Sequence, residues 1–290
     1  MGLSNVCAKY CDKLGDTPII GAILKPREKI AVLRLSGIIA DSGMRRNSIS
    51  HARYEQLIDD AFDTYKLKAI ALVINSPGGS PAQSTLIADQ IRRLAEEKEI
   101  PVYTFIEDVA ASGGYWLSLA GDEIYALPCS IVGSIGVISS GFGFQDLIAR
   151  HGIERRVHTS GKDKGFLDPF QDEKPGDVKR LKALQNDIHE QFKDWVRKRR
   201  EGRIKAEEKD IFEGQFWSAP QALEYGLIDG LGDAKTILKS RYGKDVKFKE
   251  FKAEKGVLSS LLGGSADRVS LPDTLAQTLE DKSIRSRYGL

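Results

Sequence analysis

The sequence has few cysteines and no long apolar run. Its three cysteines, Cys7, Cys11 and Cys129, are an odd number and do not form the disulfide framework of a small secreted domain. Cys7 and Cys11 lack the second ligand pair that a zinc site needs, and we expect Cys129 to be a small buried residue. The most apolar early segment, residues 18–24, is too short to span a bilayer, and no signal peptide is visible. These absences predict a cytoplasmic protein with reduced thiols.

A large excess of charge of either sign is also absent. The chain has 43 lysines and arginines against 41 aspartates and glutamates, a formal net charge of +2, which gives no indication of a nucleic-acid partner, and we expect none. Both signs alternate along residues 185–209, which is typical of a solvated helix face. Gly78 and Gly79 are not followed by the Gly-Lys-Ser/Thr sequence of a phosphate-binding loop, and Pro77 removes one backbone donor. No metal ion or organic cofactor is implied.

Predicted strands and helices alternate along most of the chain. Apolar, β-branched runs with short connections to amphipathic segments predict an α/β fold with a largely parallel sheet. The 290 residues, 41% of them hydrophobic, are enough for a substantial core. The predicted strands are 29–39, 69–75, 102–106, 123–126, 135–139 and 245–251, and the predicted helices are 54–65, 82–97, one that begins near Ser112, 177–200 and 219–225.

We divide the chain into three parts. Residues 1–28 hold an amphipathic helix and a lead-in, residues 29–252 form the main domain, and residues 253–290 form a tail that is loosely held or docked on a neighbouring subunit. In the first part, apolar residues from Leu3 to Leu14 recur at helical spacing. This stripe predicts packing on the domain or on another subunit, and peripheral contact with a membrane surface is the alternative.

The segment D-V-A-A-S-G-G-Y-W, residues 108–116, contains a candidate nucleophile. Ser112 is followed by Gly113 and Gly114, which allow a sharp turn from a strand into a helix. At such a turn the serine hydroxyl is exposed and backbone N–H groups converge near it. The same motif also occurs in ordinary turns, so the interpretation depends on two further segments.

Those two segments lie on either side of Ser112. Residues 70–80, I-A-L-V-I-N-S-P-G-G-S, form an apolar strand that ends in glycines, whose N–H groups can point outward as an oxyanion hole requires. Residues 159–170, T-S-G-K-D-K-G-F-L-D-P-F, contain Lys162 and Lys164 in a loop. A lysine acts as a general base only in its neutral form, which burial or a neighbouring cation favours.

Together these segments resemble the signal peptide peptidase A family, serine peptidases of the S49 type, over most of the chain. The resemblance implies a ClpP/crotonase-like fold of repeated ββα units and a Ser-Lys dyad. It implies that Ser112 is the nucleophile, Lys164 the general base and Ser134 the residue that orients the lysine, and that the N–H groups of Gly79 and Gly113 form the oxyanion hole. The matching segments, in order, are V-L-R-L-S-G-I-I, I-N-S-P-G-G-S, A-A-S-G-G-Y-W, S-I-V-G-S-I-G-V, G-K-D-K-G-F-L-D-P-F and A-L-E-Y-G-L-I-D-G-L-G-D.

Lys162 is the rival for the general base. In an extended segment, residues 162 and 164 point to the same face, so periodicity does not choose between them. The family frame G-x-x-K-x-x-x-x-P-F selects Lys164, since Gly161, Pro169 and Phe170 fill its other positions.

A Ser-His-Asp triad is the alternative within hydrolases. The histidines are His51, His151, His158 and His189. A ClpP-like enzyme carries its histidine where this chain has Val137, and none of the four lies there. We expect His189 to be solvated on a charged helix, and His158 to lie at the surface or at a strand end.

Three functions fit these residues. The first is a serine endopeptidase that hydrolyses short, extended, apolar peptides such as signal-peptide remnants. The family resemblance then implies a homo-oligomeric ring or bowl in which one chain supplies both Ser112 and Lys164. The second is a crotonase-type acyl-CoA enzyme, which needs carboxylates, such as Glu107 and Asp108, near the thioester. The third is a catalytically silent scaffold, which the presence of Ser112, Ser134 and Lys164 disfavours.

Overall fold

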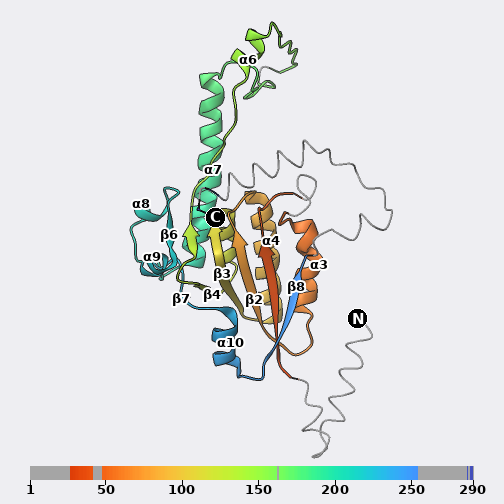
Figure 1. Ribbon diagram of the computed structural model, residues 1–290, viewed down its shortest axis with the longest axis vertical. Coiled ribbons are helices and arrows are strands. Elements are labelled where there is room, and N and C mark those ends of the chain that lie inside the picture. Colours follow the sequence, from red (N-terminus) through yellow and green to blue (C-terminus); the bar gives the residue numbers. More distant parts are fainter. Residues whose placement is uncertain (1–26, 42–47, 162, 254–285, 287, 290) are drawn as a thin grey trace, which may run out of the picture.

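The computed structural model describes residues 27–41, 48–161, 163–253, 286 and 288–289 (Figure 1). The predicted N-terminal helix, Lys162 and most of the predicted C-terminal tail lie outside the described residues. Within these residues, no helix combines the length and the apolar character that crossing a bilayer requires.

An eight-stranded sheet forms the centre of the molecule. The strands are β1 (Lys29–Ser36), β2 (Leu67–Ser76), β3 (Val102–Ala111), β4 (Glu123–Ala126), β5 (Ile131–Gly133), β6 (Phe216–Ser218), β7 (Gly230–Leu231) and β8 (Lys247–Lys252). Their order is β6-β5-β3-β2-β1-β8, and β4 pairs with β3 and β7. Among the described strands, only β5 and β6 pair antiparallel. The predicted α/β fold with a largely parallel sheet is therefore confirmed.

Helices cover both faces of the sheet. They are α3 (His51–Phe62), α4 (Pro81–Lys98), α5 (Gly113–Ser118), α6 (Gln145–Arg150), α7 (Pro175–Arg199), α8 (Glu208–Ile211), α9 (Ala219–Glu224) and α10 (Ala234–Tyr242). Strand β2 is buried on both faces, as is usual for a central parallel strand. Its residues Leu72 and Ile74 join the larger core with α3, α4 and α5, whereas Ala71 and Val73 join the smaller core with α10.

Helix α7 links the body of the molecule to a protruding arm. We call residues 136–161 and 163–174, between Ile135 and α7, the arm. The C-terminal half of α7 packs on α5: the rings of Phe192 and Trp116 lie 4.9 Å apart, and Trp195 Nε1 donates to the Trp116 carbonyl at 3.1 Å. Its N-terminal half extends beyond the sheet and carries the arm with α6, as Figure 1 shows.

The structure corrects two local predictions. The predicted strand at 135–139 is absent from the described residues; instead, the three-residue β5 ends at Gly133. The positive φ angles of Gly133 (117°) and Ser134 (56°) turn the chain out of the extended conformation. Cys129 is exposed rather than buried, because it lies in the turn between β4 and β5.

A buried arginine fixes the end of α7. The Arg200 side chain is 1% exposed, and its Nε and Nη2 both donate to the Gly226 carbonyl, at 2.9 and 2.7 Å. Its Nη1 donates to Asp229 Oδ2 at 2.7 Å, and the same oxygen accepts the Ile124 N–H. Arg200 therefore connects α7 with the segment before β7 and, through Asp229, with β4.

We expect Arg200→Ala to lower the free energy of unfolding by about 3 kcal/mol or more, because it removes the main partner of a largely buried carboxylate. Arg197→Ala is the matched control. Arg197 is also an ion-paired arginine near the end of α7, but its side chain is 37% exposed, so its loss costs less than about 1 kcal/mol. Denaturant unfolding of both variants measures the difference. Equal losses in the two variants would show that Arg200 does not anchor the end of α7.

Candidate active site

Ser112 lies in a sharp turn between β3 and α5. Its φ and ψ are 52° and −122°, a conformation that non-glycine residues rarely adopt and that costs of order 1–3 kcal/mol. The Ser112 N–H donates to the Gly133 carbonyl of β5 at 2.8 Å, which helps to hold the turn. The side chain is half-buried at the C-terminal end of the parallel strands. This is the position of a nucleophile on a strand-turn-helix unit.

Helix α5 holds this turn from the opposite side. All six residues of α5 are buried. The Tyr115 hydroxyl donates to the Leu227 carbonyl at 2.8 Å. Burial raises the pKa of Tyr115, so the phenol stays neutral and keeps this donor. The first turn of α5, which begins directly after Ser112, is thereby fixed to the body of the molecule.

Two backbone N–H groups converge beside Ser112. Gly113 begins α5, so its N–H has no acceptor within the helix. A Cβ on Gly113 would lie 3.3 Å from the Gly79 nitrogen, and a Cβ on Gly78 would lie 2.8 Å from Ser112 Cβ. Among the described residues, neither Gly79 N–H nor Gly113 N–H donates a hydrogen bond. Both donors are available to an oxyanion.

The conformation of Gly79 requires a glycine. Its φ is 142°, and a Cβ would lie 1.9 Å from the Ile39 carbonyl oxygen. That carbonyl accepts the Ser80 N–H at 2.8 Å, while the Ile39 N–H donates to the Gly78 carbonyl at 2.9 Å. The backbone after β1 therefore clamps the glycine pair and directs the Gly79 N–H.

A backbone hydrogen bond links the segment of Ser134 to the turn at Ser112. It directly follows Gly133, whose carbonyl accepts the Ser112 N–H, and its own N–H donates to the Gln215 carbonyl at 2.6 Å. In this chain the Ser134 Oγ accepts a hydrogen bond from the Tyr288 hydroxyl at 3.4 Å. The Tyr288 ring also packs edge-on against Phe216, with centroids 5.1 Å apart.

Lys164 lies in the arm and is exposed. Its neighbour Asp163 pairs with Arg180 near the start of α7, with Oδ2 and Nη2 2.9 Å apart. Phe192, which contacts α5, lies about 18 Å further along α7 at a rise of about 1.5 Å per residue. The long helix thus holds Lys164 away from the Ser112 of the same chain, as Figure 1 shows for the arm. The expectation that one chain supplies both residues is not met.

Among the described residues, Ser112 forms no hydrogen bond with a histidine. His151 and His158 are exposed in the arm, and the backbone N–H of His51 donates to Gln83 Oε1 at 2.7 Å. His189 is not solvated as predicted: it is half-buried, and its Nε2 donates to the Ile135 carbonyl at 3.2 Å. Within the described part of the chain, no histidine is therefore hydrogen-bonded to Ser112 as a Ser-His-Asp triad requires.

The carboxylates available to an acyl-CoA enzyme have other partners. Glu107 Oε1 pairs with Arg34 Nη1 at 2.6 Å, and Asp108 Oδ2 accepts the Asn75 side-chain amide at 2.6 Å. No group of three or more histidine, cysteine, aspartate or glutamate side chains in the described part of the chain could hold a metal ion. The geometry thus favours hydrolase chemistry at Ser112 over acid–base chemistry at these two carboxylates.

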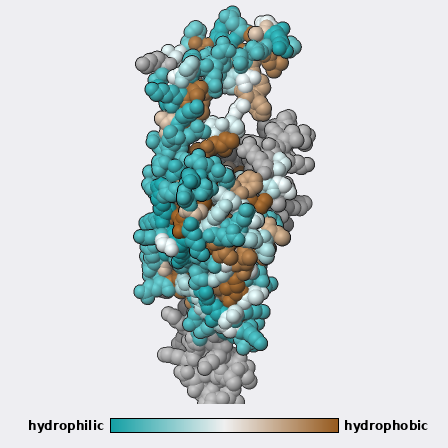
Figure 2. Space-filling view, turned by 90° about the vertical axis from the view of Figure 1, so that its left-hand side faces the viewer, coloured by the Kyte–Doolittle hydropathy of each residue, from teal (hydrophilic) through white to brown (hydrophobic). Residues whose placement is uncertain are grey.

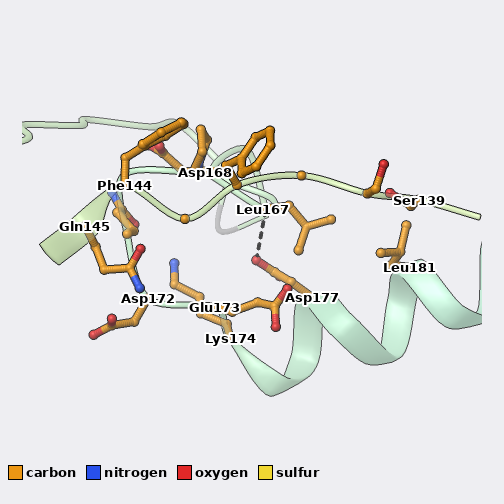
Figure 3. Close-up of a pocket in the computed structure, with 17 residues that line it drawn as sticks. Ser139, Phe144, Gln145, Leu167, Asp168, Asp172, Glu173, Lys174, Asp177 and Leu181 are labelled. Carbon is orange, nitrogen blue, oxygen red and sulfur yellow. Dashed lines mark hydrogen bonds between the residues drawn. The ribbon is translucent and has the colours of Figure 1, made fainter. Parts of the chain in front are cut away.

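The arm contains a cavity of about 700 Å³ that does not include Ser112. Figure 3 shows that it lies between the segment before α6, the loop that leads into α7, and the first turns of α7. The Leu167 N–H donates to Asp177 Oδ2 at 3.3 Å across one wall. Apolar and acidic side chains share the lining, including Phe144, Leu181, Asp172 and Glu173. The cavity is a feature of the arm and is separate from the nucleophile.

Sequence reasoning missed two residues near the candidate site. The high charge of its helix predicts that His189 is solvated, although Phe192 and Val196 follow it at the spacing of one buried helix face. That spacing could have placed His189 on the inner face. No pattern in the sequence indicates that Tyr288 contacts Ser134, because this contact depends on tertiary structure alone.

Comparisons with known proteins identify the family of this chain. The family model described as "Peptidase family S49" matches residues 94–247, more than half of the chain, and the match includes Ser112, Ser134 and Lys164. A putative signal peptide peptidase SppA of Enterococcus faecium is 30% identical over 266 residues, which are 89% of this chain and 76% of that protein. The chloroplastic serine protease SPPA of Arabidopsis thaliana is 30% identical over 271 residues, 89% of this chain and 40% of that protein.

One similar protein has a name from another functional class. A Brucella abortus protein named Na(+)/H(+) antiporter NhaA is 46% identical over 273 residues. These residues are 90% of this chain but 37% of that protein, so the chain spans little more than a third of its length. The transport in that name concerns the whole Brucella protein. The family match and the strand-turn-helix unit at Ser112 agree with each other, and this chain belongs to peptidase family S49.

Proposed function

We propose that this protein is a serine endopeptidase with Ser112 as its nucleophile. The observation that carries the proposal is the positive-φ turn at Ser112 beside the N–H groups of Gly79 and Gly113, which donate no hydrogen bond among the described residues. When Ser112 Oγ attacks a carbonyl carbon, the carbonyl oxygen becomes an oxyanion, and these two donors stabilise it. The loss of one such donor typically lowers the rate by about 10²–10³-fold.

The reaction follows the general course of serine acyl transfer. Ser112 Oγ forms a bond to the peptide carbonyl carbon while its proton passes to the neutral amine of Lys164. The tetrahedral intermediate then collapses, the C–N bond breaks, and the protonated lysine gives its proton to the leaving amine. Water hydrolyses the acyl-enzyme in a second step. The Ser134 hydroxyl hydrogen-bonds the lysine amine and orients it.

We propose that Lys164 reaches Ser112 of a neighbouring subunit in a homo-oligomer. Two observations support this. Asp163, the neighbour of Lys164, pairs with Arg180 near the start of α7, in the arm and away from the Ser112 of the same chain. The arm also exposes large apolar side chains that need cover. Among them are Ile138 (71% exposed), Phe142 (81%), Leu147 (52%) and Ile153 (59%). Figure 2 shows apolar groups among hydrophilic ones in the upper part of the molecule, where the arm lies. A second copy would cover such a surface.

We propose short, extended, apolar peptides as the substrates. The name of the Enterococcus faecium protein refers to signal peptides, and the remnants of such peptides are apolar and extended. The transport named for the Brucella protein is not proposed for this chain, which matches only a minor part of that protein.

Incubation with a panel of fluorogenic apolar peptides tests this function. We expect cleavage by the wild type, and we expect a serine-directed phosphonate to stop cleavage and to label Ser112, which peptide mass spectrometry can locate. Labelling at another serine, or cleavage that persists after complete labelling, would contradict the proposal. Acyl-CoA turnover without peptide cleavage would favour the crotonase alternative.

A further inference from the structure

His189 is a polar residue on the inner side of α7. Its Nε2 donates to the Ile135 carbonyl at 3.2 Å, and the same carbonyl accepts the Gly214 N–H at 3.1 Å. The Ile135 side chain is fully buried, so this carbonyl lies against the core. Phe192 and Val196, further along the same face of α7, are apolar and buried. An aliphatic residue at 189 would continue that face but would not donate to Ile135.

The Ile135 carbonyl belongs to a three-residue segment, residues 133–135, that contains Ser134 and is hydrogen-bonded to Ser112. Gly133 accepts the Ser112 N–H at 2.8 Å, Ser134 donates to the Gln215 carbonyl at 2.6 Å, and Ile135 accepts from His189. Ser134 has a φ of 56°, so its side-chain direction depends on these neighbouring hydrogen bonds rather than on a favoured backbone conformation.

His189 also marks the point where α7 leaves the body. Earlier residues of the helix, such as Asp177 and Arg180, contact the arm. Among the described residues, none of those before His189 in α7 has a hydrogen bond between its side chain and the body of the molecule. The same imidazole thus joins the Ser134 segment to the helix that carries Lys164.

We propose that His189 is a positioning residue that fixes the direction of the Ser134 hydroxyl. This inference rests on the proposed function. Because His189 holds the backbone carbonyl next to Ser134, its loss lets the 133–135 segment relax, and the hydroxyl then orients the lysine amine less well. The effect falls on the chemical step and not on substrate binding.

Steady-state kinetics of His189→Leu with a cleaved fluorogenic peptide test the proposal. We expect kcat to fall about tenfold and KM to change less than about twofold, since an orienting contact acts in the transition state. Asp187→Leu, which changes an exposed residue of the same helix, is expected to leave kcat unchanged. A rise in KM with unchanged kcat would contradict the positioning role.

Two further variants separate positioning from folding. His189→Gln keeps an N–H donor of similar reach and is expected to restore most of kcat, whereas the shorter amide of His189→Asn does not reach Ile135. Equal kcat values for these two variants would overturn the proposal. This comparison stays informative if His189→Leu does not fold.

A double mutant tests the route through Ser134. In a Ser134→Ala background, His189→Leu is expected to lower kcat less than about twofold, because the hydroxyl that it positions is already absent. A full tenfold loss in both backgrounds would show that His189 acts independently of Ser134. If Ser112→Ala kept the hydrolysis rate of the wild type, the proposed function itself would be wrong. If Ser112→Ala lost hydrolysis but the His189 variants kept the wild-type rate, only the positioning role of His189 would be wrong.

Discussion

Ser112→Ala is expected to lower peptide hydrolysis by at least about 10⁴-fold, because no other group can form the acyl-enzyme. The backbone of Ser112 already has the unusual φ of 52°, and its N–H bond to Gly133 does not involve the side chain. The free energy of unfolding should therefore change by less than about 1 kcal/mol. Hydrolysis of a fluorogenic peptide and denaturant unfolding, measured on the same preparation, check both parts.

Ser118→Ala is the matched control for this variant. Ser118 lies at the end of the same helix, where its hydroxyl donates to the Gly114 carbonyl at 2.9 Å. That bond is local to α5, so its loss should leave hydrolysis within a few-fold of the wild type. Retained hydrolysis in Ser112→Ala, or equal losses in both variants, would exclude Ser112 as the nucleophile.

Lys164→Ala is expected to lower hydrolysis by about 10²–10⁴-fold, the usual contribution of a general base. Lys164→Arg should be no better, because a guanidinium stays protonated and cannot accept the Ser112 proton. Because Lys164 is exposed in the arm, neither substitution should affect the folding of a subunit. The hydrolysis rates of these two variants, of Lys162→Ala and of the wild type are measured with the same fluorogenic peptide.

Lys162→Ala distinguishes the two lysines of this loop. We expect it to keep hydrolysis within a few-fold of the wild type, because the family frame selects Lys164. Loss of hydrolysis in Lys162→Ala, with activity kept in Lys164→Ala, would reverse the assignment. An active Lys164→Arg would exclude proton transfer to this lysine.

The sequence predicts the centre of the fold well, because its strands are long and strongly apolar. The run in β2 is buried on both sides of the sheet, and the glycines after it and after Ser112 place the two turns correctly. The shorter strands could not be located in the same way. In the segment S-I-V-G-S-I-G-V, β5 ends at Gly133 because the next residue, Ser134, also has a positive φ, which the apolar pattern does not report.

The candidate site was predicted only in part, because two of its features depend on tertiary structure. The order of the motifs along the sequence does not indicate how far α7 holds Lys164 from Ser112. That distance follows from a continuous helix of 25 residues, packed on α5 only near its C-terminal end. Similarly, the contact between His189 and Ile135 joins residues 54 positions apart. A charged helix sequence does not indicate such a contact.

Subunit mixing tests the central claim that Ser112 and a lysine from another subunit form one site. Ser112→Ala and Lys164→Ala chains, each inactive alone and carrying different affinity tags, would be co-expressed and purified through both tags. We expect roughly one quarter of the wild-type rate, since random neighbours pair an intact Ser112 with an intact Lys164 about one time in four. Chains with both substitutions, mixed with Ser112→Ala, should stay inactive. Mixed oligomers no more active than either parent would contradict the shared site.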